Sequence, residues 1–271
     1  MKLGILAKTF ERPTVEGVFE AVKAHSMECV QFNMASAGLA SMPDEIDPAI
    51  IARIHYAAQA SGVEIAAMSG TFNMIHPDLA EREKGQRRLR VLAAACQGLG
   101  AGVITLCTGT RDPLNMWRRH PENDLPEAWS DLLHAIEAAL RIAEDERVTL
   151  AFEPEHANVI NSARRGRALL DAMQSPRLKV VVDGANLIEP GDDQKRVLDE
   201  AFDLLGEEIV IAHGKDRAVD GGFCAAGQGI LDYAHYLDLL QHISFSGPFI
   251  LHGLAESQVG TSLQFLHSRL R

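Results

Sequence analysis

The sequence predicts a single-domain α/β protein built as a (β/α)8 barrel. Eight short apolar runs occur along its 271 residues, and each is followed by a helix-type segment. Strict alternation of strands and helices is typical of a parallel sheet covered by helices, and about 250 residues is the usual length of a closed barrel. The first run is not followed by the GxGxxG pattern of a dinucleotide-binding open sheet, which is the alternative fold. We therefore expect one barrel domain over residues 1–271.

The apolar runs have the length of strands, and their composition indicates burial on both faces. Pro154 ends the fifth run, because proline cannot donate a hydrogen bond to a sheet, so Glu153 is expected to be the last strand residue. The predicted strands are Leu3–Ala7, Cys29–Phe32, Val63–Met68, Val103–Cys107, Val148–Glu153, Leu178–Val182, Ile209–Ala212 and Pro248–Leu251.

The helices follow from apolar residues at helical spacing, as with Ile50, Ile51 and Ile54 in the second helix. The predicted helices are Val15–Ala24, Pro48–Ala60, Leu79–Leu99, Glu127–Asp145, Arg164–Met173, Asp193–Leu205, Ile230–His242 and Ser257–Leu270. Two long loops, Ser69–Asp78 and Thr108–Leu125, follow the third and fourth strands. In a barrel both lie at the carboxyl face, where functional sites are built.

Composition narrows the class of protein. The net charge is −11 and no basic block is evident, which argues against a general binder of nucleic acid or membrane surfaces. The four cysteines are scattered without paired spacing, as expected for reduced thiols. No apolar run approaches the length of a transmembrane span, and the N-terminal run is too short for a signal peptide. We therefore expect a cytoplasmic protein.

Four neighbouring strands each end in a residue that could bind a metal ion. Glu153 ends the fifth strand, Asp183 and His213 follow the sixth and seventh, and His252 follows the eighth. Each alone has a structural explanation, such as a turn aspartate before glycine for Asp183. Together they would meet at one layer of a barrel, where mixed oxygen and nitrogen ligands suit Mn, Mg, Co or Zn.

Several of these strand ends resemble those of a known family. Phe152–Pro154, Val182–Asn186 and Ala212–Asp216 are similar to the metal-binding strand ends of the xylose isomerase-like TIM-barrel family, and Gly227–Gly229 resembles its turn before the seventh helix. That family includes sugar isomerases, sugar 3-epimerases, inosose dehydratases and endonuclease IV. The resemblance covers nearly the whole chain and implies a divalent metal held by Glu, Asp, His and Glu on strands five to eight.

The eighth strand departs from the family pattern. His252 stands where the last Glu is expected, and Glu256, four residues on, is the alternative ligand. Geometry favours His252, since Glu256 has left the strand. In the epimerases of the family two glutamates act as base and acid, whereas here only Glu153 is clearly placed. Glu153 and His252 are the candidate catalytic residues, although the lone pair of a metal-bound His252 would already be used.

Five residues near the expected barrel mouth are candidates for substrate binding. Lys8 ends the first strand, and His76 and Arg111 lie in the two long loops. Arg111 could hold a phosphate or carboxylate through forked hydrogen bonds. His156 follows Glu153 closely, and Lys215 lies where the resemblance implies a substrate-facing lysine. Each could equally be a solvated or loop-packing residue.

These observations favour a metal-dependent isomerase or epimerase of a sugar or related hydroxy-carbonyl compound, working by proton abstraction through an enediolate. Three alternatives stay open: a metal-dependent dehydratase of an inosose-like substrate, an endonuclease IV-like phosphodiesterase, and a non-catalytic sugar-binding protein with a degenerate metal site. The net charge weighs against the phosphodiesterase. A small carbohydrate is the expected partner, and a homo-oligomer stays open.

Overall fold

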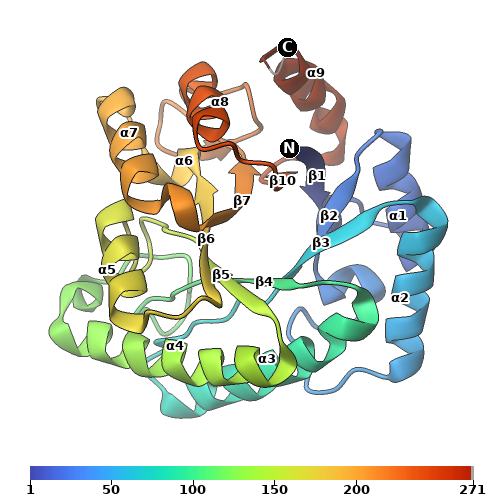
Figure 1. The fold of residues 1–271 in the computed structure, drawn as a ribbon, viewed down its shortest axis with the longest axis horizontal. Helices are drawn as coiled ribbons and strands as arrows, with labels where there is room; N and C mark the ends of the chain where they lie inside the picture. The colour runs from blue at the N-terminus through green and yellow to red at the C-terminus, as the bar shows by residue number, and fades with distance from the viewer. Residues whose placement is uncertain (270–271) are drawn as a thin grey trace.

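A computed structural model describes residues 1–269 of the chain and shows a closed eight-stranded parallel barrel within a ring of helices (Figure 1). Around the barrel the strands follow the order β1-β10-β7-β6-β5-β4-β3-β2. The barrel closes where β1 pairs with β10, with Lys2 opposite Pro248 and Ile5 opposite Leu251. The predicted fold class is confirmed.

The observed barrel strands are β1 (Lys2–Leu6), β2 (Cys29–Phe32), β3 (Glu64–Ser69), β4 (Val103–Leu106), β5 (Thr149–Phe152), β6 (Leu178–Asp183), β7 (Ile209–Gly214) and β10 (Pro248–Leu251). The helices are α1 (Val15–Ala24), α2 (Pro48–Ser61), α3 (Leu79–Leu99), α4 (Pro126–Glu146), α5 (Ala163–Met173), α6 (Gly184–Leu187), α7 (Gln194–Leu205), α8 (Tyr233–His242) and α9 (Val259–Arg269).

Most element boundaries differ from the predicted ones by only one or two residues. The prediction that Glu153 ends the fifth strand is wrong, because β5 stops at Phe152 and Pro154 offers no N–H for further pairing. In contrast, β6 and β7 run further than predicted, since Asp183 pairs in register with His213. The last helix begins at Val259 after a 3₁₀ turn, and its predicted end at Leu270 lies outside the described residues.

Helices begin where side chains can cap their free N–H groups. Asp78 accepts a hydrogen bond from the backbone of Ala80 at the start of α3, and Asp193 accepts from Arg196 at the start of α7. Gly62 and Gly100 end α2 and α3 in the left-handed conformation. These local signals fix where each helix returns toward the next strand.

Besides the short helix α6, the structure contains a hairpin that the sequence pattern did not predict. A short antiparallel hairpin, β8 (Asp216–Arg217) with β9 (Phe223–Cys224), follows β7. The buried carboxylate of Asp216 accepts backbone hydrogen bonds from Gly227 and Leu231, which fixes the return of the chain. Gly229 fits there because a Cβ would lie 2.2 Å from the carbonyl oxygen of Arg217. The hairpin is therefore anchored directly beyond the carboxyl end of β7.

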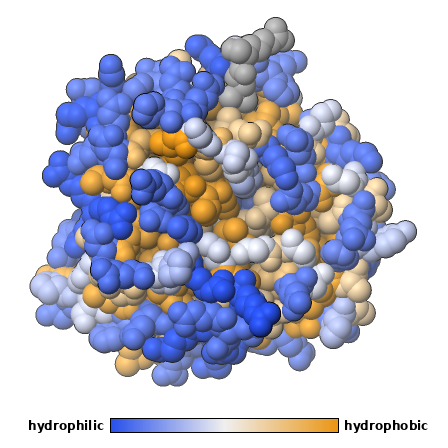
Figure 2. Space-filling model, in the orientation of Figure 1, coloured by the Kyte–Doolittle hydropathy of each residue, from blue (hydrophilic) through white to orange (hydrophobic). Residues whose placement is uncertain are grey.

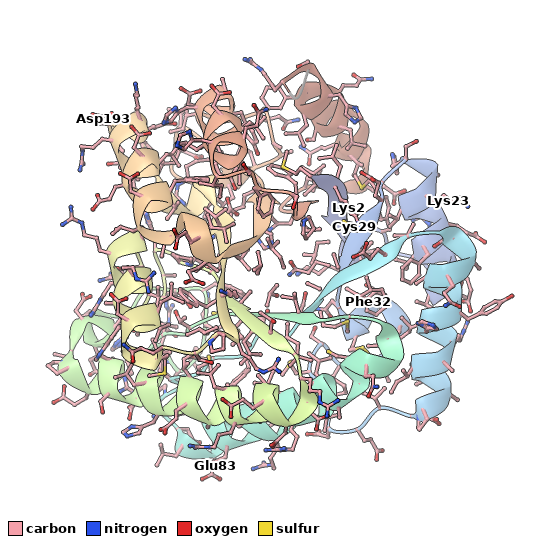
Figure 3. All side chains as sticks on the ribbon, in the orientation of Figure 1. Lys2, Lys23, Cys29, Phe32, Glu83 and Asp193 are labelled. Carbon is pink, nitrogen blue, oxygen red and sulfur yellow. The ribbon has the colours of Figure 1, made fainter. Side chains whose placement is uncertain are left out.

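The apolar core has two parts because successive strand residues point to opposite sides of the sheet. One part lies between the barrel and the helices, where Phe32 stacks on Phe19 of α1. The other fills the barrel interior and consists of Cys29, Ala67, Ala151, Val181, Ile211 and Ile250. Figure 3 labels Cys29 and Phe32, two residues of the same strand that belong to these two separate cores.

Figure 2 shows how hydrophobic and hydrophilic residues are distributed over one face of the molecule. Hydrophobic residues gather toward its middle, over the strands, while hydrophilic residues dominate the rim, over the helices. Lys23, Glu83 and Asp193 mark this polar rim in Figure 3. No helix among residues 1–269 has the length and apolar character needed to cross a lipid bilayer.

Ile211 gives a direct test of the interior core, because its side chain is fully buried inside the barrel. Ile211→Ala is expected to lower the free energy of unfolding by about 2–5 kcal/mol, since the rigid barrel cannot collapse around the cavity. Ile211→Val should cost only about 0.5–1.5 kcal/mol. Urea unfolding of both variants measures the difference, and equal losses would contradict the assignment of Ile211 to a close-packed layer.

Candidate metal centre

The four candidate ligands project into the barrel because of the two-residue repeat of their strands. Glu153, Asp183, His213 and His252 each stand two positions after a member of the interior core: Ala151, Val181, Ile211 and Ile250. Residues two apart on a strand share a face. The four side chains therefore form the next layer, at the carboxyl end of the barrel.

The layer brings the four side chains within reach of a single ion. One ligand atom from each residue lies within 4.8 Å of every other, and no other such group occurs among residues 1–269. Asp183 and His213 are buried, and 17% of each side chain of Glu153 and His252 is exposed. Two carboxylates this deep are costly unless cations or hydrogen bonds compensate them.

Asp183 is surrounded by donors. Its Oδ2 atom lies 2.9 Å from His252 Nε2 and 3.4 Å from Lys215 Nζ, and its Oδ1 accepts from the backbone of Ala185. Burial alone would raise the pKa of Asp183, but the charge of Lys215 and the hydrogen bond with His252 hold it below its usual value. Asp183 is therefore an anion in the folded protein.

Glu153 contacts neighbours from α6 and β7. Its Oε1 accepts a hydrogen bond from Asn186 Nδ2, and its Oε2 lies 3.2 Å from His213 Nδ1. Burial opposes ionisation of Glu153, but its close contact with His213 and the positive charge of Lys215 bring its pKa below the usual value. Like Asp183, Glu153 offers a negatively charged oxygen ligand.

His213 and His252 are the candidate nitrogen ligands, and their rings lie 4.5 Å apart. His213 Nε2 is hydrogen-bonded to Gln31 Oε1, whereas Nδ1 is buried and has no hydrogen-bond partner. Burial and the neighbouring His213 and Lys215 lower the pKa of His252 to about 4, which keeps its ring neutral near pH 7. A neutral imidazole is the form that binds metals.

The structure places His252, and not Glu256, in the cluster. Glu256 instead forms a two-pronged ion pair with Arg12, with separations of 2.6 and 2.9 Å. The residue types and the unpartnered Nδ1 of His213 fit a divalent cation: two carboxylate oxygens, two imidazole nitrogens and convergent geometry.

Among the five candidate substrate residues, Lys215 lies nearest the cluster. It is buried, contacts Asp183, and its Nζ lies 3.9 Å above the ring of Phe223 on the hairpin. His156 lies further toward the rim, where its Nδ1 is 3.3 Å from Glu189. Both remain predictions as substrate contacts.

The other three candidates lie apart from the cluster. His76 joins the two long loops by a 3.2 Å hydrogen bond to the carbonyl of Pro113. Arg111 is ion-paired with Asp131 and donates to the carbonyl of Ile75. Lys8 is exposed in the 3₁₀ turn that follows β1. His76 therefore connects the two long loops, and Arg111 connects them to α4. None of these contacts involves the four-residue cluster.

The structure also brings in polar residues that sequence reasoning did not select. Asn186 holds Glu153, and Gln31 holds His213. Glu155 lies close enough to be affected by the charge of Glu153, and burial together with that charge raises its pKa to about 7. The sequence does contain a signal for Gln31: it is the single polar residue in the predicted strand Cys29–Phe32, where a polar side chain needs a hydrogen-bond partner.

Comparisons with known proteins agree with this architecture. The model of the family described as "Xylose isomerase-like TIM barrel" matches residues 19–269. No curated protein matches the chain by sequence.

Solved structures resemble the fold over nearly its whole length. The probable 3-DHS dehydratase AsbF from Bacillus anthracis has a TM-score of 0.78 at 14% identity, covering 99% of this chain and 100% of that one. D-psicose 3-epimerase from Clostridium cellulolyticum H10 has a TM-score of 0.76 at 14% identity, with both chains fully covered. The 3-keto-D-glucoside 4-epimerase YcjR from E. coli has 0.75 at 16%, covering 99% of each chain.

Cation binding should stabilise the fold through the four-residue cluster. In protein stripped with a chelator, adding Mn²⁺ to about 100 times its dissociation constant is expected to add about 2.7 kcal/mol to the free energy of unfolding. Asp183→Asn should lose most of this gain. Asp44→Asn is the matched control, because Asp44 pairs with Arg88 at the surface and should respond like the wild type. Equal stabilisation of both variants would count against the cluster as the binding site.

The low pKa of His252 predicts acid sensitivity in the metal-free protein. The unfolded chain binds a proton on this histidine below about pH 6.5, whereas the folded chain does so only below about 4. Stability should therefore fall as the pH drops through this window. Relative to His252→Asn, the wild type should show an additional slope of up to about 1.4 kcal/mol per pH unit. Urea unfolding in the presence of chelator gives the free energy of unfolding of both proteins as a function of pH. Parallel curves for the wild type and His252→Asn would contradict the prediction.

Proposed function

The chain belongs to the xylose isomerase-like TIM barrel family, and on this premise we propose that it is a divalent-metal-dependent isomerase or epimerase of a sugar or related hydroxy-carbonyl compound. The reaction would begin with proton abstraction from the carbon beside a carbonyl and pass through an enediolate. The observation that carries the proposal is the convergence of Glu153, Asp183, His213 and His252 at the carboxyl end of the barrel. Active sites of barrels of this kind are built at that end.

The four residues of the cluster would hold the cation. When bound there, a divalent ion supplies Lewis-acid stabilisation of the negative charge that develops on substrate oxygens. Glu153 is the group that removes the proton, since its Oε1 is oriented by Asn186 and its carboxylate is ionised. Lys215, which contacts Asp183, adds a positive charge that favours an anionic transition state.

A sugar-like substrate is supported by the names of structurally similar proteins. These names include a D-psicose 3-epimerase and a 3-keto-D-glucoside 4-epimerase. The polar layer of the four-residue cluster also suits a small molecule rich in hydroxyl groups, which can exchange hydrogen bonds with carboxylates and imidazoles. Substrate roles for His156 and Lys215 belong to this proposal, as does a role for His252 in catalysis.

A dehydratase is the second candidate, and the strand-eight position favours it. An epimerase that inverts a carbon needs a proton donor on the face opposite its base, and the position that would supply it carries His252, a neutral ring engaged with Asp183. A dehydratase can begin with the same proton abstraction by Glu153 and then expel a hydroxyl group. One structural neighbour is named a probable 3-DHS dehydratase.

The test is solvent deuterium exchange with the Mn²⁺-loaded protein and a panel of ketoses, aldoses and cyclic hydroxyketones. An epimerase yields an isomer with deuterium at the abstracted position, and an isomerase yields one with deuterium at the former carbonyl carbon, whereas a dehydratase yields an unsaturated product. Glu153→Gln is expected to slow exchange at least about 100-fold, because general-base catalysis typically contributes a factor of 10²–10⁴.

Glu256→Gln is the matched control, since it changes a glutamate of the β10–α9 connection that pairs with Arg12 outside the cluster. It should retain the wild-type rate. Wild-type exchange in Glu153→Gln, or undiminished turnover in chelator-stripped protein, would contradict the proposal.

A further inference from the structure

A chain of buried polar side chains crosses the barrel interior directly beside the candidate metal centre. Gln31 on β2, Ser69 at the end of β3, Thr105 on β4 and His213 on β7 are each at most 5% exposed. The neighbouring interior layer is apolar and contains Cys29, two positions before Gln31. Polar groups in such a place are costly unless their hydrogen bonds are satisfied.

The hydrogen bonds of this chain define the orientation of the Gln31 amide. Thr105 Oγ1 can donate to the carbonyl of Met68, which leaves its lone pairs free to accept. Gln31 Nε2 donates to Thr105 Oγ1 at 3.1 Å and to Ser69 Oγ at 3.2 Å. Both amide hydrogens are thereby used on one side, and the amide oxygen is the atom that faces His213.

An amide oxygen can only accept, so the nitrogen that it contacts must carry a hydrogen. Gln31 Oε1 lies 2.9 Å from His213 Nε2. In a neutral imidazole, a hydrogen on Nε2 leaves a lone pair on Nδ1. The Nδ1 atom is buried without a hydrogen-bond partner and lies 3.2 Å from Glu153 Oε2, on the side of the four-residue cluster.

From this geometry we infer that Gln31 is a positioning residue that fixes His213 in its Nε2–H tautomer and thereby makes Nδ1 the metal-ligating atom. The inference rests on the proposed metal-dependent function. Gln31 acts through His213 and has no place among the four ligands. Ser69 and Thr105 support it by preventing the amide from turning its N–H groups toward the imidazole.

A neutral amide suits this position better than a carboxylate. Many metal-bound histidines donate their second N–H to a carboxylate or a carbonyl oxygen. Here Glu153 and Asp183 already place two anions in a buried layer, and a third carboxylate on β2 would add an uncompensated charge. Glutamine provides the acceptor without that charge.

The experiment measures two properties of the full-length protein. Mn²⁺ affinity is obtained by competition with a chromophoric chelator, and the tautomer of His213 is obtained from long-range ¹H–¹⁵N correlation spectra of the metal-free protein, assigned with His213→Asn. In the wild type we expect a protonated Nε2 and an unprotonated Nδ1. Gln31→Met, which keeps the volume but removes the acceptor, should weaken Mn²⁺ binding roughly 10- to 100-fold and mix the tautomers.

Two variants separate positioning from packing. Gln31→Glu restores an acceptor and should recover the Nε2–H tautomer, even where its added buried charge lowers stability. Cys29→Ala removes packing at the inward position two residues earlier on the same strand and should change neither property, even where it lowers stability.

The possible failures can be told apart. A wild-type proton on Nδ1, or a Gln31→Met protein whose affinity and tautomer match those of Cys29→Ala, overturns the inference whatever the enzyme does to sugars. If the tautomer and the affinity respond to Gln31 as expected but no hydroxy-carbonyl compound exchanges deuterium, the proposed function fails and the inference about Gln31 stands.

Discussion

The candidate site depends on the alternation of side chains along the barrel strands. Because every second residue points inward, one apolar interior layer determines where the next layer lies, and Val181 and Ile211 lead directly to Asp183 and His213. The register between β6 and β7 then sets these two residues side by side. A shift of one residue in either strand would turn its ligand toward the helices.

Buried charge is the second constraint, and the surrounding residues compensate it locally. Lys215 and His252 satisfy Asp183, while Asn186 donates a hydrogen bond to Glu153, which also lies beside His213. These groups come from α6, from β7 and the residue after it, and from the residue after β10, so each carboxylate is held by groups from a different part of the chain. This arrangement lets the fold tolerate two anions at one layer and keeps both available to a cation.

Much of the fold and of the cluster could be predicted from the sequence, because both follow from local periodicity. The positions of Asp183 and His213 at strand ends required only the strand pattern. The predicted end of β5 at Glu153 was wrong by one residue. Pro154 shows that the strand ends before it, but it does not show whether the last paired residue is Phe152 or Glu153. The loop contacts of His76 and Arg111 join segments about 20 to 37 residues apart, which no local pattern reveals. The link from Gln31 to His213 crosses the barrel and could not be predicted either.

The seam between β1 and β10 has a consequence for how the protein is made. Lys2 pairs with Pro248, so the sheet can close only when the first strand pairs with the last one. Until then β1 and β7 have open edges, which can pair with other chains. β10 also leads into His252, so the cluster gains its fourth member in the same event that removes the exposed edges. Completion of the four-residue cluster and closure of the exposed strand edges therefore depend on the same contact between distant parts of the sequence.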